Sequence, residues 1–228
     1  MFEFIKYFLW FMIIAAVFKA CSGGENNKDA DYNAAEHNAV STNETFKTRD
    51  NFIVAIKDAN STQDAVKAQF QNASDQFMQL INFYGGALED KYVELQKEYL
   101  KSKELLNDFQ NKINKIKKSA SNLFKEWDKE IEQYSDGKIQ AKSKELKDES
   151  VKQYEMIIVL MERNEQNLED YLKILGDNVL FLKHNLNSKA VFSLREVSAE
   201  LQGNINDIIL DIDNSITKTN EFIQHMKN

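Results

Sequence analysis

The chain has 228 residues, a formal net charge of -7 at pH 7 and no proline. Net negative charge argues against nucleic-acid binding, because phosphate recognition needs clustered lysine and arginine. A proline-free chain with 29% charged residues and a mean hydropathy of -0.53 is typical of long exposed helices. We therefore expect an all-α protein without a nucleic-acid partner.

The N-terminus is typical of an export signal. Lys6 precedes an apolar run at residues 7–17, which is shorter than the roughly 20 residues needed to cross a bilayer. Ala20-Cys21-Ser22 resembles a bacterial lipobox, in which the signal is cut before the cysteine and its sulfur receives a diacylglycerol. We predict a signal peptide at residues 1–20 and lipidation of Cys21. An uncleaved membrane anchor is the alternative.

Residues 21–44 have no sustained apolar period. They are rich in Asn, Asp, Ala, Ser and Gly, a composition that buries little apolar surface. We predict a flexible tether that follows the lipidated cysteine. The expected location is the bacterial cell envelope, with the lipid anchor holding the protein to the periplasmic face of the outer membrane. Ser22 is compatible with outer-membrane export.

The longest apolar pattern in the chain runs from Leu88 to Trp127. Its steps alternate between four and three residues, and Ser102 is the only polar position in it. A period of about 3.5 residues over several heptads indicates a helix packed lengthwise against others. At 1.5 Å per residue such a helix is roughly 60 Å long.

Three further stretches repeat the same period and are separated by turn signals. The signals are Gly85-Gly86, Asp136-Gly137 and Asn187-Ser188. We predict one bundle domain at residues 45–228, with helices at about 45–82, 87–134, 139–185 and 189–226. Short loops between long helices favour an elongated antiparallel coiled coil, an up-and-down four-helix bundle.

Polar residues interrupt the apolar seams at Gln63, Ser102 and Asn164. Such residues either serve a function or fix the register of the helices, and we favour register. A basic run at residues 112–118 is a solvated face or, alternatively, a site for an acidic partner.

Three motifs, in order along the chain, resemble a known family. They are Asn82-Phe83-Tyr84-Gly85-Gly86, Leu123-Phe124-Lys125-Glu126-Trp127 and Phe181-Leu182-Lys183-His184-Asn185, each with its neighbours. They are similar to domain-of-unknown-function family 2959, bacterial proteins that often carry a lipoprotein signal. The resemblance extends from Thr45 to the C-terminus and implies a coiled, helical, envelope-associated body. It implies no catalytic residues, and lysines replace the arginines that begin the family's third helix.

The sequence contains no recognisable catalytic or metal-binding motif. His37, His184 and His225 lie in different segments without HExxH spacing, and there is no phosphate-binding loop or nucleophile elbow. We therefore expect no enzyme activity, no cofactor and no metal. The expected function is a non-catalytic, membrane-tethered scaffold or interaction lipoprotein. The alternative is a protein that binds a lipid or a small hydrophobic ligand in its aromatic-rich core.

Two of the turns are expected to meet at the bundle end far from the tether. We predict a recognition tip there that binds an envelope protein or a cell-wall partner. A homo-oligomer is also compatible with the sequence. The alternative is that these residues only shape the turns. The candidate tip residues are Asn82, Phe83, Tyr84, Gly85, Gly86, His184, Asn185 and Asn187.

Overall fold

A computed structural model gives the structure of the protein and describes residues 28–83, 85 and 87–227. The described residues form α2 (Lys28–Ile81), α3 (Leu88–Gln133), α4 (Gly137–His184), α5 (Ser188–Ser193) and α6 (Arg195–Lys227). The predicted signal peptide and Cys21 lie outside the described residues.

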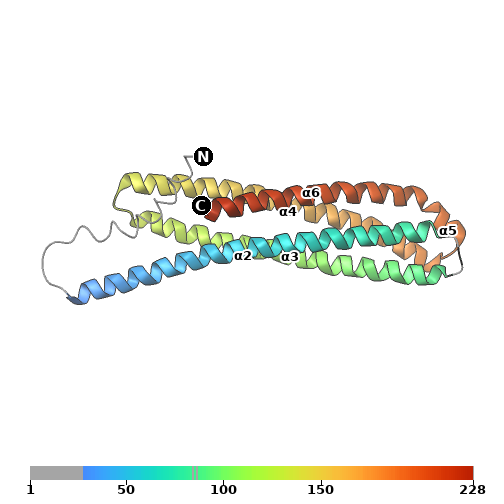
Figure 1. Ribbon diagram of the computed structural model, residues 1–228, viewed down its shortest axis with the longest axis horizontal. Coiled ribbons are helices and arrows are strands. Elements are labelled where there is room, and N and C mark those ends of the chain that lie inside the picture. The colour runs from blue at the N-terminus through green and yellow to red at the C-terminus, as the bar shows by residue number, and fades with distance from the viewer. Residues whose placement is uncertain (1–27, 84, 86, 228) are drawn as a thin grey trace.

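The four long helices form an elongated up-and-down bundle, as the sequence predicted (Figure 1). α2 and α4 each pack against both α3 and α6. α2 and α4 run in the same direction and meet across the core through large side chains, such as Phe70 and Tyr171 with ring centroids 5.8 Å apart. Burial raises the pKa of Tyr171 to about 12.

An aromatic cluster joins all four long helices near the end of α6. It contains Phe52 from α2, Phe124 from α3, Tyr154 from α4 and Phe222 from α6. The Phe52 ring is fully buried, and its centroid lies 6.1, 5.9 and 5.9 Å from the other three. These separations are within the range of favourable edge-to-face packing. The cluster therefore fixes four helices at one level.

Amide side chains link three helices in the middle of the bundle, from the buried Asn164, Gln63 and Asn60 to the exposed Asn220. Asn164 on α4 donates to Gln63 on α2 (3.4 Å), Gln63 donates to Asn60 (3.2 Å), and Asn60 donates to Asn220 on α6 (3.2 Å). A shift of one helix would leave buried polar groups unpaired, so this network favours one alignment. Ser102 instead donates to the Glu98 carbonyl of its own helix.

A second polar cluster holds α2 against α3 through a nearly buried carboxylate. The Glu98 carboxylate accepts hydrogen bonds from Gln69 (2.8 Å) and Asn72 (2.8 Å) of α2, and Lys101 donates to it at 2.9 Å. The bond from Gln69, followed by that from Lys101, lowers the pKa of Glu98. These partners satisfy a charge that would otherwise be costly to bury, since Glu98 is only 8% exposed.

Two features differ from the sequence predictions. The tether predicted for residues 21–44 is wrong from Lys28 onward, because α2 begins there. The segment has no Gly or Pro and is rich in Ala, so it continues a helix that packing has already nucleated.

The fourth predicted helix, at 189–226, is divided into α5 and α6 at Leu194. The Leu194 N–H bonds to the Val191 carbonyl at 3.1 Å, which tightens the turn. The Ser193 hydroxyl donates to the Ala190 carbonyl at 2.7 Å and competes with the regular helical pattern.

Candidate functional site

The predicted tip residues lie at one end of the bundle, where α2 ends, α3 begins and α4 passes into α5 (Figure 1). The described ones are Asn82, Phe83, Gly85, His184, Asn185 and Asn187; Tyr84 and Gly86 lie outside the described residues. Asn82, Gly85, His184, Asn185 and Asn187 are exposed, and Phe83 is half-buried. Two turns that are distant in the sequence therefore share one end.

The amide side chains at this end are engaged in shaping the turns. Asn82 Nδ2 donates to the Met78 carbonyl and Asn185 Nδ2 donates to the Phe181 carbonyl, each at 3.0 Å. Asn187 Oδ1 accepts from the N–H groups of Lys189 and Ala190, each at 3.1 Å, and so caps α5. These contacts give the amides a structural role that needs no partner.

Phe83 also belongs to its turn. A Cβ at Gly85 would lie 3.3 Å from Phe83 Cζ, so the ring covers the glycine closely. This contact gives Phe83 a structural role in the turn, which is to cover Gly85.

Large apolar side chains next to these turns stay exposed. We call Leu180, Phe181 and Phe192 the tip surface; they are 59%, 42% and 64% exposed. The Arg195 guanidinium lies 4.6 Å from the centre of the Phe192 ring. Because the bundle does not bury these side chains, its own packing does not explain them. The tip surface was not among the residues predicted from the sequence.

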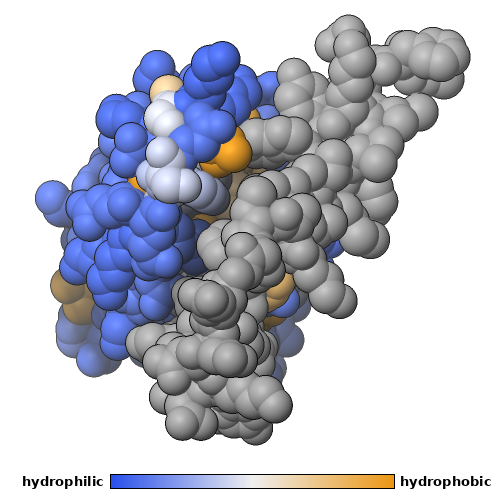
Figure 2. Space-filling view, turned by 90° about the vertical axis from the view of Figure 1, so that its left-hand side faces the viewer, coloured by the Kyte–Doolittle hydropathy of each residue, from blue (hydrophilic) through white to orange (hydrophobic). Residues whose placement is uncertain are grey.

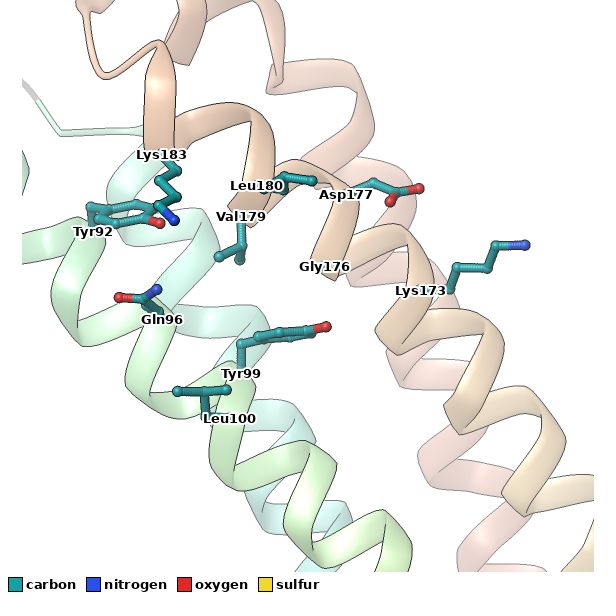
Figure 3. A pocket seen from close by; sticks show the side chains of 10 residues that line it. All are labelled: Tyr92, Gln96, Tyr99, Leu100, Lys173, Gly176, Asp177, Val179, Leu180 and Lys183. Atoms are coloured by element: carbon teal, nitrogen blue, oxygen red, sulfur yellow. The ribbon is translucent and has the colours of Figure 1, made fainter.

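A groove of about 430 Å³ lies between α3 and α4 below the tip (Figure 3). We call it the α3–α4 groove. The side chains of Tyr92 and Tyr99 extend from α3 into the space between the helices (Figure 3). The groove is lined by Tyr92, Gln96, Tyr99, Leu100, Lys173, Gly176, Asp177, Val179, Leu180 and Lys183.

Gly176 allows Tyr99 to lie against the backbone of α4. A Cβ at position 176 would be 2.6 Å from Tyr99 Oη and 3.0 Å from Tyr99 Cζ. A glycine inside a helix costs roughly 1 kcal/mol relative to alanine, so it needs a compensating reason, and here that reason is the tyrosine. A lone glycine within a helical pattern signals a close approach at this position, although it does not name the residue that approaches.

Cations lie close to both tyrosines. Lys183 lines the groove beside Tyr92, and Lys103 Nζ lies 5.8 Å from the centre of the Tyr99 ring. Neither lysine forms an ion pair with the residues that the structure describes. The Tyr92 hydroxyl oxygen is buried without a hydrogen-bond partner there, and burial raises the pKa of Tyr92.

Among the residues whose side chains the structure describes (46–83, 85 and 87–227), no group of three or more His, Cys, Asp or Glu is placed to hold a metal ion. None of the helices in this part combines the length and the apolar composition that a membrane crossing requires.

Comparison with known proteins identifies a family. The family described as "Protein of unknown function (DUF2959)" matches residues 33–226. Comparisons with curated proteins and with solved structures gave no match. Because the family match covers most of the chain, the protein belongs to the DUF2959 family.

Proposed function

We propose that this protein is a non-catalytic scaffold of the bacterial cell envelope that binds a protein or cell-wall partner through its tip. The observation that carries the proposal is the exposure of Leu180, Phe181 and Phe192 at one end of the bundle. Exposed apolar side chains that gather at one place commonly mark an interaction site. The rigid bundle would hold this surface at a fixed distance from the tether.

The proposal includes a lipid anchor at Cys21 on the periplasmic face of the outer membrane. It is supported by the short apolar run that ends in Ala20-Cys21-Ser22. Metabolic labelling with an alkyne fatty acid should mark the wild type and not Cys21→Ser. Equal labelling of the two proteins would exclude lipidation at this cysteine.

Site-specific photo-crosslinking in native envelopes tests the tip. A photoreactive amino acid placed at Phe181 or Phe192 should give a discrete adduct. The matched control is Leu210 on α6, which is 68% exposed and lies away from both turns. Adducts of the same size from all three positions would mean that the tip has no special role. No adduct at Phe181 or Phe192 would contradict binding at the tip.

The alternative function, a lipid or small-ligand binder that opens its core, has less support. Phe52, Phe70, Phe77 and Phe109 are at most 1% exposed, and opening the bundle would separate their packed surfaces. The α3–α4 groove lies at the surface between the two helices, and Val179 is its lining residue that belongs to the buried core.

A further inference from the structure

The α3–α4 groove has the side-chain spacing with which helices pack. On α3, Tyr92, Gln96 and Tyr99 follow one another by steps of four and three, and all three line the groove. On α4, Gly176, Leu180 and Lys183 follow the same steps. Side chains with this spacing form ridges, and the side chains of another helix pack into the groove between two such ridges. From Tyr92 to Leu100 the α3 wall is about 12 Å long, or roughly two helical turns.

The groove also presents apolar surface that the bundle leaves uncovered. Leu100 on α3 is 52% exposed and Leu180 on α4 is 59% exposed, and both line the groove. Val93 lies seven residues before Leu100, on the same face of α3, and is 59% exposed. One helix lying along the groove would cover apolar positions on both walls.

The charges at the groove indicate what must flank that apolar seam. Lys103 and Lys183 lie near the two tyrosines and form no ion pair with the described residues. Lys173 and Asp177 also line the groove, but their charges are opposite and both side chains point away from α3 (Figure 3). The groove is therefore locally positive on a chain whose net charge is -7.

We propose that the α3–α4 groove binds an amphipathic helix of a partner protein as a fifth helix, with flanking carboxylates paired to Lys103 and Lys183. The aliphatic seam of that helix covers Leu100 and Leu180. This inference rests on the proposed function, because it names the chemistry of the partner that the tip end receives. The partner is an acidic helix, because the helical spacing of the groove fits a helix and a basic helix does not fit the same lysines.

Peptide binding to the full-length protein in detergent tests the inference. The probe is a fluorescent synthetic peptide of about three heptads, with Leu at the seam positions and Glu at the flanking positions. A second peptide has Lys in place of every Glu. Fluorescence anisotropy should show binding of the Glu peptide and roughly tenfold weaker binding of the Lys peptide, as expected for two reversed charge pairs.

Charge reversal in the protein should reverse this preference. Lys103→Glu combined with Lys183→Glu should weaken the Glu peptide roughly tenfold and strengthen the Lys peptide. The matched control combines Lys118→Glu and Lys152→Glu, which change exposed lysines on the same two helices outside the groove. The control should bind both peptides as the wild type does. Melting temperatures of all variants check that each is folded.

Two results would overturn the inference. The first is equal binding of the Glu peptide to the wild type and to the groove variant. The second is that phosphatidylglycerol vesicles, and not the Glu peptide, bind through Lys103 and Lys183, which would assign the groove to an anionic lipid. Adducts at Phe181 and Phe192 that persist in either case would leave the tip function standing. Loss of those adducts with intact peptide binding would contradict the tip function alone.

Discussion

The ring cluster near the end of α6 and the tip surface differ in how their aromatic residues are buried. Near the end of α6, three rings from α3, α4 and α6 pack on the buried Phe52 ring of α2. At the tip, Phe181 and Phe192 are exposed to solvent. Figure 2 looks at the end opposite the tip, and the described surface in that view is mostly hydrophilic. The ring cluster therefore stabilises the fold near the end of α6, whereas Phe181 and Phe192, like Phe46 at the start of the described α2 side chains, are not buried by the bundle.

This difference separates residues that the fold needs from residues that it can lose. A buried ring fills space between the helices, so truncating it leaves a cavity that destabilises the fold. An exposed ring contributes little to stability, and its retention calls for an explanation outside the fold. The predictions below test this comparison from the largest expected effect to the smallest.

Truncation of the central ring should have the largest effect. Phe52→Ala should lower the free energy of unfolding by about 3–5 kcal/mol, because the other three rings lose their common contact. Urea denaturation followed by circular dichroism measures the loss. Phe52→Leu is the control and should lose clearly less, since it keeps most of the volume. Equal losses of stability in Phe52→Ala and Phe52→Leu would show that the size of the cavity does not set the effect.

Disruption of the Glu98 cluster should come next and should depend on pH. Glu98→Gln should cost about 1–3 kcal/mol near neutral pH, because an NH2 group replaces the oxygen that accepts from Lys101 and the charge that strengthens the bonds from Gln69 and Asn72 is lost. Hydrogen bonding lowers the pKa of Glu98 in the folded state, so its contribution is complete above the unfolded pKa of about 4.3.

That contribution should disappear as pH falls through the folded pKa of Glu98. Urea denaturation at about pH 7 and about pH 3 should therefore show a smaller difference between wild type and Glu98→Gln at the second pH than at the first. A difference that is constant across this range would contradict the role of the charge.

Adding a methyl group at Gly176 should change the free energy of unfolding by less, and in the direction opposite to the usual one for Gly→Ala in a helix. Gly→Ala inside a helix normally stabilises by about 1 kcal/mol, but here the new Cβ meets Tyr99 Oη at 2.6 Å. We expect Gly176→Ala to destabilise the wild type by about 1 kcal/mol, as overpacking does. In a Tyr99→Ala background the same change should stabilise. A stabilising effect in both backgrounds would mean that the ring moves aside freely.

Loss of the exposed tip rings should have the smallest effect on stability. Phe181→Ser combined with Phe192→Ser should change the free energy of unfolding by no more than about 1 kcal/mol, as is usual for exposed positions. The same double variant should lose the tip adduct in native envelopes, with the photoreactive residue placed at Leu180. A large loss of stability would show instead that these rings belong to the fold.

Part of the candidate site was accessible from the sequence. The paired turns at residues 82–86 and 184–187 follow from helices of matched length, so their shared end could be predicted. The role of Asn187 as a helix cap follows from its side chain at the start of α5. Gly176 and Tyr99 could not be paired in this way, because their contact depends on how closely α3 and α4 approach each other.

The sequence by itself determined the all-α class and the up-and-down bundle. A seam with a period near 3.5 residues can bury its apolar side only along other helices, and glycine or Asn-rich turns reverse the chain. It also placed Gln63 and Asn164 inside the seam, where their hydrogen bond favours one register.

Only the tertiary structure decided which apolar residues are left outside the core. Periodicity assigns a residue to one side of its helix but does not say how far the neighbouring helix covers that side. The exposure of Leu100, Leu180 and Phe192, and the lysines beside the two groove tyrosines, follow from helix separation and the break at Leu194. These are distances between elements, which local pattern does not encode because many packings satisfy the same apolar period.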